Sequence, residues 1–126
     1  MIHQEVTLSA PPERVYAVLT DGKLFAQMTG GAPADIGAGE GAPFQLFGGM
    51  ILGRHVELVP GERVVQAWRV KLWPPGEYSL VRFTLARDGA GTKLVLDHTG
   101  YPEGEHDHLS AGWPKQYFEP LAQFFR

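Results

Sequence analysis

The 126-residue sequence contains no cysteine, which excludes disulfide bonds, thiolate chemistry and cysteine-rich zinc sites. Long apolar runs are also missing, since no stretch approaches the roughly 20 residues that cross a bilayer. The first five residues lack the basic start and the apolar centre of a signal peptide. We therefore expect a cytoplasmic protein without a membrane span.

The chain also lacks a large excess of charge of either sign. With 11 Lys and Arg against 14 Asp and Glu, the formal net charge of -3 offers no broad basic surface for nucleic acid or for an anionic membrane. What the chain does contain is apolar: 44% of its residues are hydrophobic and 11% are aromatic, which excludes a disordered chain. The length suits one core, and no internal repeat or boundary signal divides it. We therefore expect a single domain over residues 1–126.

The first third of the chain predicts one strand and two short helices. Residues 2–8 have the alternation of a strand, and Pro12 then suits the first turn of a helix. Thr20 is the expected N-cap of a second helix over residues 21–28. The glycine-rich stretch 30–41 indicates a loop that holds a short strand around Asp35. It does not predict a phosphate-binding loop, because a strand pattern follows it where a helix would have to begin.

From residue 44 onward the sequence predicts a meander of antiparallel strands. Turn pairs such as Gly48-Gly49 and Pro60-Gly61 separate short stretches in which apolar and polar side chains alternate. The expected strands cover residues 44–47, 51–59, 62–72, 78–87 and 92–99. With the first strand and the short one in the loop, the sheet has about six to seven strands.

The last quarter of the chain changes from a period of two to a period of four. In residues 92–99, one face of the strand carries Leu94, Leu96 and His98. Beyond Glu105, a single stripe recurs at every fourth residue: Leu109, Trp113, Tyr117 and Leu121. A long C-terminal helix therefore follows the last strand, and it must bury this stripe against the sheet that precedes it.

Two prolines interrupt this helix. Pro114 and Pro120 each remove a backbone donor and clash with the preceding turn, at a cost of roughly 3 kcal/mol in a straight helix. Either the stripe curves to follow the sheet, or the helix begins at Trp113 with Pro114 in its first turn and ends near Gln123. The sequence leaves both alternatives open.

The elements carry landmarks of a known family in a fixed order. The landmarks are Ala10-Pro11-Pro12-Glu13-Arg14-Val15-Tyr16, Gly53 followed by Leu58-Val59-Pro60 and Trp68, the strand Thr92-x-Leu94-x-Leu96-x-His98-x-Gly100, and Gly112-Trp113. In their order and spacing, which cover almost the whole chain, the sequence resembles the activator-of-heat-shock-chaperone-ATPase homologue family. That family is a branch of the START-like helix-grip superfamily.

The resemblance implies both a fold and a partner. The fold is α+β, with two short helices after the first strand and a curved antiparallel sheet wrapped around the long C-terminal helix. The partner is a heat-shock chaperone. The family's eukaryotic namesake has a second, N-terminal domain that is important to its ATPase stimulation, and this sequence corresponds only to the C-terminal domain.

The sequence predicts no metal site, no cofactor and no catalytic residue. The densest group of potential metal ligands is Glu103, Glu105, His106, Asp107 and His108. On a helix its two histidines lie about 200° apart and cannot converge on one ion. None of the three serines, Ser9, Ser79 and Ser110, lies in a nucleophile elbow or has a histidine partner that spacing predicts. A START-like hydrolase or cyclase is therefore the third-ranked function.

His98 is the polar member of an apolar strand face. Asp97 points to the opposite face, so the strand itself forms no Asp–His pair. The neutral imidazole suits a hydrogen bond either within the core or to a bound ligand. Arg54, which alternates with apolar neighbours, is expected to point outward.

A sheet that curls around a helix with large aromatic side chains leaves a wedge-shaped space between the two layers. In the superfamily that this sequence resembles, this wedge often holds an apolar ligand. We predict a cavity there, lined by Trp68, Phe83, Leu96, His98, Trp113, Tyr117 and Leu121. The first-ranked function is a non-catalytic module that binds a small hydrophobic ligand. The alternative is a chaperone-linked protein-interaction module in which the wedge is plain core.

Overall fold

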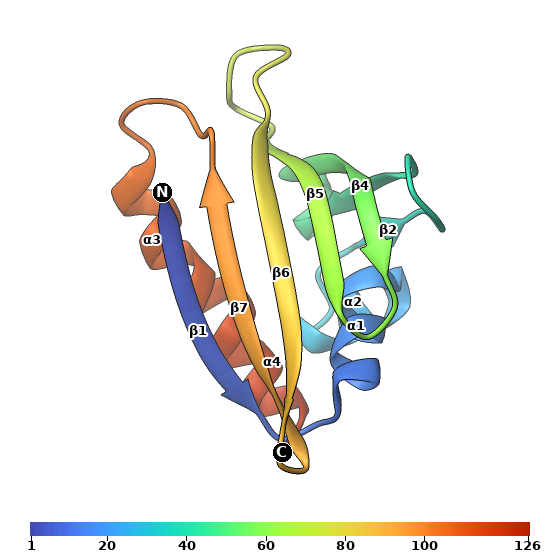
Figure 1. Ribbon diagram of the computed structural model, residues 1–126. Helices are drawn as coiled ribbons and strands as arrows, with labels where there is room; N and C mark the ends of the chain where they lie inside the picture. Colours follow the sequence, from blue (N-terminus) through green and yellow to red (C-terminus); the bar gives the residue numbers. More distant parts are fainter.

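A computed structural model describes residues 1–126 and shows one curved antiparallel sheet (Figure 1). The strands are β1 (Ile2–Leu8), β2 (Asp35–Ile36), β3 (Pro43–Leu46), β4 (Ile51–Val59), β5 (Arg63–Val70), β6 (Ser79–Asp88) and β7 (Gly91–Thr99). Their order across the sheet is β1-β7-β6-β5-β4-β3-β2. The chain therefore forms a meander from β2 to β7, and its first strand pairs with its last.

The helices lie together on one face of the sheet (Figure 1). They are α1 (Pro12–Thr20), α2 (Gly22–Met28), α3 (His106–Trp113), the π-helical turn η2 (Pro114–Phe118) and α4 (Glu119–Phe124), and a short 3-10 turn, η1 (Phe47–Gly49), joins β3 to β4. None of them is long and apolar enough to cross a membrane. The two short helices follow β1, and the C-terminal run packs against the sheet, so the predicted helix-grip arrangement is confirmed.

Alternation along the strands directs one set of side chains toward the helices. In β7, Leu96 and His98 are buried beneath the C-terminal helix, whereas Asp97 lies on the outer face, as the period of two predicts. The helix contributes its own stripe to this core, and all four of its members are buried: Leu109, Trp113, Tyr117 and Leu121. The predicted contact between stripe and sheet is therefore confirmed.

The C-terminal end of β5 differs from the predicted one. The predicted strand 62–72 ends at Val70, and Leu72, the last residue of the predicted range, is 80% exposed on the next loop. The amide of Trp73 donates to the carbonyl of Val70 at 3.0 Å and closes a turn. Pro74 follows and has no donor with which to extend a ladder. The loop therefore leaves the sheet two residues earlier than the alternation suggests.

The predicted cap of α2 is also wrong. The side chain of Asp21, not that of Thr20, accepts the amide of Leu24 at 3.0 Å. Thr20 still belongs to α1, where its hydroxyl donates to the carbonyl of Tyr16 at 2.8 Å. Asp21 has the extended backbone that a capping residue needs, so it both ends α1 and begins α2.

Gly53 on β4 faces inward beneath the ring of Phe44. A Cβ at this position would overlap that ring and the carbonyl oxygen of Ala67 on the neighbouring strand. We expect Gly53→Ala to lower the free energy of unfolding by about 1–3 kcal/mol, because a backbone carbonyl cannot yield as a flexible side chain can. Urea unfolding measures the loss. In the control Gly112→Ala the new methyl group meets nothing within 4 Å, and an equal loss there would contradict this steric explanation.

The C-terminal helix runs through both prolines. It begins at His106, so the alternative start at Trp113 is wrong. Between the prolines the amide of Glu119 donates to the carbonyl of Pro114, five residues back, which is the wide turn of a π-helix. A stripe spaced by four residues drifts around an α-helix of about 3.6 residues per turn. The wider turn slows this drift and keeps Tyr117 on the buried face.

The carbonyl that Pro114 leaves without a donor finds one on another element. In an unbroken α-helix the carbonyl of Ser110 would accept the amide of residue 114, which proline lacks. The side-chain amide of Gln4 on β1 donates to that carbonyl instead, at 2.8 Å. This bond satisfies the orphaned acceptor and fixes α3 to the first strand.

Candidate functional site

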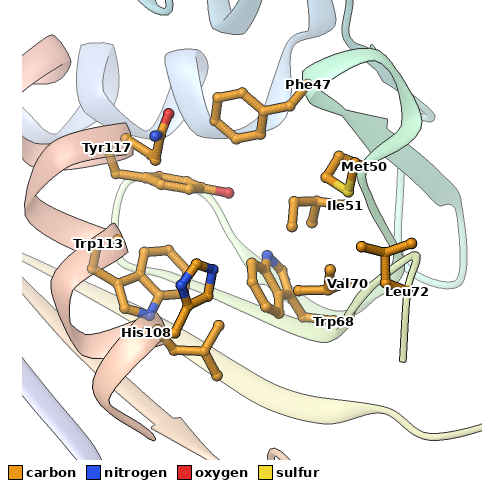
Figure 2. Close-up of a pocket in the computed structure, with 12 residues that line it drawn as sticks. Phe47, Met50, Ile51, Trp68, Val70, Leu72, His108, Trp113 and Tyr117 are labelled. Carbon is orange, nitrogen blue, oxygen red and sulfur yellow. The ribbon is translucent and has the colours of Figure 1, made fainter. Parts of the chain in front are cut away.

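An open cavity of about 340 Å³ lies between the C-terminal helix, the start of β4 and the end of β5 (Figure 2). Its walls are mostly apolar. They are formed by Phe47, Met50, Ile51, Trp68, Val70, Leu72, His108, Leu109, Gly112, Trp113, Gln116 and Tyr117. The volume lies at the lower end of the roughly 300–1,000 Å³ that small-molecule sites occupy.

Local structure explains why the cavity stays open. The alternation of β5 sends Trp68 and Val70 toward the helix, and the helix presents Gly112 to them. Glycine within a helix costs about 1 kcal/mol relative to alanine, so it is an unfavourable choice unless its small size matters. A Cβ on Gly112 would meet no atom within 4 Å. The helix therefore crosses the cavity without filling it.

Two residues that line the cavity each have a buried polar atom without a hydrogen-bond partner. The indole nitrogen of Trp68 and the hydroxyl of Tyr117 are inaccessible to solvent, and neither makes a hydrogen bond. In Figure 2 both point into the region between the helix and Ile51. Burial raises the pKa of the Tyr117 hydroxyl, and the nearby Trp68 N–H opposes this shift in part, although the two groups do not meet hydrogen-bond geometry. The hydroxyl therefore keeps its proton at neutral pH.

His98 belongs to a closed chain of hydrogen bonds in the core. The Nε1–H of Trp113 donates to Nδ1 of His98 at 3.1 Å, which assigns the ring proton to Nε2. Nε2 then donates to the hydroxyl of Ser79 at 2.8 Å, and that hydroxyl donates to the carbonyl of Trp68 at 2.7 Å. Burial, with a smaller effect of the charged N-terminus, lowers the pKa of His98 to about 4. The imidazole is therefore neutral and fully satisfied.

The Ser79–His98 pair is not arranged as a nucleophile and its base. Both residues are buried, and no spacing in the sequence predicted that they would meet. The serine proton is directed at a main-chain carbonyl, and the remaining ring nitrogen already accepts from Trp113, so neither nitrogen is free to take that proton. The pair supports the core structurally.

The structure brings together only part of the predicted site. Trp68, Trp113 and Tyr117 line the cavity. The other four predicted residues are buried in the adjoining core and do not line it: Phe83, Leu96, His98 and Leu121. Sequence reasoning placed Leu109 on the correct helix face but missed its neighbours Gly112 and Gln116. An i, i+3, i+4, i+7 pattern from Leu109 finds both residues.

The acidic and histidine-rich segment before and within α3 has other partners. The carboxylate of Glu105 accepts the indole N–H of Trp73 at 2.9 Å, and His106 contacts Asp107 at 3.1 Å. No group of three or more His, Asp or Glu side chains in the structure could hold a metal ion. Arg54 points outward as predicted and donates to the carbonyl of Gly41 at 3.0 Å.

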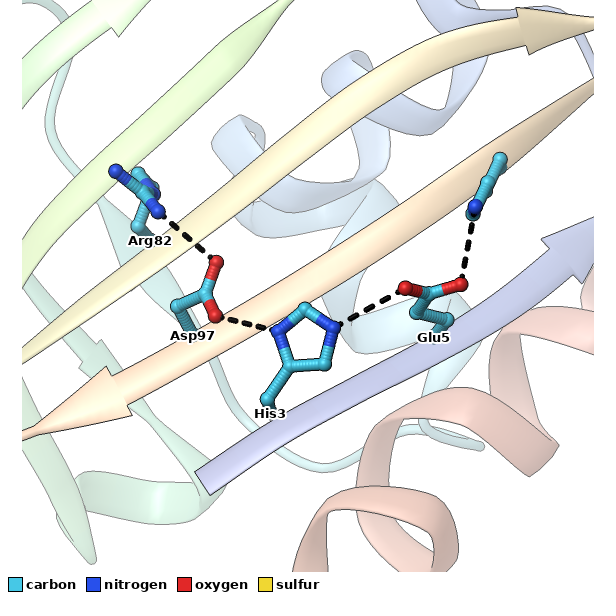
Figure 3. A network of polar contacts seen from close by, with 5 residues as sticks. His3, Glu5, Arg82 and Asp97 are labelled. Atoms are coloured by element: carbon cyan, nitrogen blue, oxygen red, sulfur yellow. Dashed lines mark hydrogen bonds and ion pairs between the residues drawn. The ribbon is translucent and has the colours of Figure 1, made fainter. Parts of the chain in front are cut away.

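The outer face of the sheet carries a network of charges across β1, β7 and β6 (Figure 3). His3 contacts Asp97 at 2.6 Å and Glu5 at 3.1 Å, and Arg82 donates to the second oxygen of Asp97 at 3.0 Å. Hydrogen bonds to Asp97 and then to Glu5 raise the pKa of His3. Lys93 at 3.0 Å and His3 lower the pKa of Glu5. These groups lie on the opposite side of the sheet from the cavity.

Comparison with known proteins identifies a family. The family model described as "Activator of Hsp90 ATPase homolog 1-like protein" matches residues 9–126. The human activator of 90 kDa heat shock protein ATPase homolog 1 is 33% identical over 119 residues, which cover 94% of this chain and 35% of that protein. The mouse homolog 2 is 31% identical and is covered to 36%. The chain therefore spans about a third of the length of these curated relatives.

Solved structures show the same fold at nearly full coverage. An HSP90 activator from Plasmodium falciparum superposes with a TM-score of 0.89 at 25% identity, covering 98% of this chain and 96% of that one. A protein of Chromobacterium violaceum has a TM-score of 0.77 at 29% identity, with 98% and 95% covered. On the extent of the family match, the chain belongs to the activator of Hsp90 ATPase homolog 1-like family.

Proposed function

We propose that this chain is a non-catalytic binding module that takes a small hydrophobic ligand into the cavity beside its C-terminal helix. The observation that carries the proposal is Gly112, a helical residue that faces unfilled space. A side chain there would both fill the cavity and favour the helix, so its absence keeps room for a guest. The exposed rim, which includes Met50 and Leu72, gives an apolar entrance.

Filling the cavity tests this function. An apolar fluorescent dye should bind the wild-type protein, and Gly112→Leu should abolish the binding while the fold is retained. Its matched control is Ala111→Leu, which adds a similar bulk to the neighbouring exposed position of α3 and should leave binding unchanged. A wild-type protein that binds no dye, or a folded Gly112→Leu variant that binds as well as wild type, would reject the proposal.

A second candidate is a chaperone-linked interaction module, and it is favoured by the relatives. The human and mouse relatives are named for activating the 90 kDa heat-shock protein, and the Plasmodium falciparum activator matches this chain over nearly the full length of both chains. We propose that a 90 kDa chaperone is a partner of this chain too. Calorimetric titration of the purified chain into such a chaperone should show saturable binding. No binding heat and no change in chaperone ATPase rate would remove this candidate.

A further inference from the structure

The outer face of the sheet consists of two unlike halves. On β1 and β7 it carries the paired charges of Figure 3. Across β4, β5 and β6 it carries Leu52, Ala67 and Leu80, and the last of these is 47% exposed. No helix covers these strands from this side (Figure 1). The solvated face of an antiparallel sheet normally carries polar side chains, so the apolar half is suited to a contact with another molecule.

Two arginines border these apolar side chains. In the register of β4 and β5, Arg54 lies opposite Ala67, and Arg69 lies opposite Leu52. The half-exposed ring of Tyr78 lies over Arg69, with its centre 5.6 Å from the guanidinium carbon. We call this surface the outer patch, and it consists of Leu52, Arg54, Ala67, Arg69, Tyr78 and Leu80. The outer patch combines apolar contact area with two positive charges.

The two positive charges of the outer patch have no acidic partner. Arg54 and Arg69 donate only to main-chain carbonyls. The other cations of this face each meet a carboxylate at 3.0 Å or less, and they are Arg63, Arg82 and Lys93. Arg54 is exposed, so a partner can reach it directly, whereas Arg69 is 9% exposed and acts through its field beneath Tyr78. A partly desolvated charge is screened less than one in water, so the patch attracts a carboxylate.

The spacing of the two arginines defines the shape of the partner. Arg54 and Arg69 are diagonal neighbours on adjacent strands, because Arg54 pairs with Ala67 and Arg69 follows two residues later. Such positions lie about 7–8 Å apart. Side chains two residues apart in an extended chain project from one face at about 7 Å. An extended segment with two carboxylates in this spacing therefore matches both charges.

Nucleic acid and anionic membranes fit this surface less well. Each is bound by many basic groups, since every neutralised phosphate or headgroup adds only a small increment. The outer patch has two, and the carboxylates of Glu5 and Asp97 lie on the adjoining strands of the same face. A broad anionic surface would meet these acids, whereas a short peptide segment avoids them.

We propose that the outer patch binds an extended acidic segment of a partner protein. Two carboxylates of the segment lie against Arg54 and Arg69, and an apolar side chain packs on Ala67 and Leu80. Along β5, Trp68 lines the cavity and alternates with Ala67 and Arg69, so the outer patch lies on the opposite side of the sheet from the cavity. This inference goes beyond the ligand-binding function and does not depend on it.

A labelled peptide that contains Glu-Ser-Glu-Leu-Leu tests the proposal by fluorescence polarisation. We expect saturable binding to the wild-type protein, and about tenfold weaker binding of a peptide in which lysine replaces both glutamates. Arg54→Glu should weaken binding of the acidic peptide by about tenfold. The control Arg87→Glu makes the same charge change at the C-terminal end of β6, where Arg87 pairs with Glu13, and should leave the affinity within about twofold.

Leu80→Ser tests the apolar part of the outer patch. The position is exposed, so the fold should remain, and we expect the affinity for the acidic peptide to fall severalfold. The proposal is wrong if the wild-type protein does not bind the acidic peptide, if both peptides bind equally, or if Arg87→Glu weakens binding as much as Arg54→Glu. It is also wrong if Arg54 is needed for binding to phosphatidylserine vesicles or for dimerisation in light scattering in place of peptide binding, since the occupant would then be a membrane or a second copy of the chain.

Discussion

Trp113→Ala is expected to lower the free energy of unfolding by about 3–5 kcal/mol. The indole is 2% exposed and packs between the sheet and its own helix, with ring centres 5.8 Å from Phe83 and 4.6 Å from Tyr117. Truncation also leaves Nδ1 of His98 without its donor in the core. Guanidinium unfolding monitored by far-UV circular dichroism measures the loss. An unfolding midpoint equal to that of wild type within error would contradict the claim that Trp113 packs the C-terminal helix against the sheet.

Trp113→Phe separates the two parts of that effect. Phenylalanine keeps most of the apolar contact but has no N–H for His98, so we expect a smaller loss, about 1–3 kcal/mol. Gln116→Ala, one turn along the same helix and exposed, should stay within about 0.5 kcal/mol of wild type. A loss in Trp113→Phe as large as that in Trp113→Ala would mean that the hydrogen bond, and not the packing, dominates.

The sequence predicts the elements well because period and turn chemistry are local signals. Leu94, Leu96 and His98 repeat every two residues, and the helical stripe repeats every four, so both buried faces follow from spacing alone. The errors lie where tertiary contacts decide. Leu72 fits the alternation of β5, but a turn closed by the Trp73 amide and followed by Pro74 removes it from the sheet.

The cavity was harder to predict than the fold. The sequence identifies which side chains face inward, yet inward-facing residues divide into those that meet other side chains and those that border empty space. Phe83 and Leu96 are inward-facing too and are nonetheless packed in the core, where Phe83 lies against the rings of Trp113 and Tyr117. Gly112 marks the opening, but a glycine before a tryptophan gives no signal of volume in a sequence.

His98 illustrates the same limit in polar terms. Its strand face was predictable, but its partners Ser79 and Trp113 come from β6 and α3, and no spacing rule connects them. The sequence left open whether His98 forms a hydrogen bond within the core or to a ligand. The contacts with Ser79 and Trp113 show that it is bonded within the core. This makes the residue a probe of stability rather than of binding.

The buried imidazole has a definite effect on stability as pH changes. Its pKa of about 4 in the folded protein lies below the ordinary value of 6.5, so between these values the unfolded chain binds a proton that the folded one does not. The stabilisation is fully present above pH 6.5 and is lost as pH falls toward 4. Across this window the shift corresponds to about 3 kcal/mol. Burial lowers the pKa of His55 as well, and its contribution has the same sign.

We therefore expect the free energy of unfolding to fall by about 2 kcal/mol between pH 7 and pH 5, measured by urea unfolding. His3 provides an internal control, because its pKa is raised by Asp97 and Glu5 and its stabilisation is instead lost as pH rises through that raised value. In an NMR titration the ring signals of His98 should stay constant until the pH approaches 4, while those of His3 should move above pH 6.5. A His98 ring that titrates near 6.5 would show that water reaches it, and the closed chain through Ser79 and Trp113 would then be wrong.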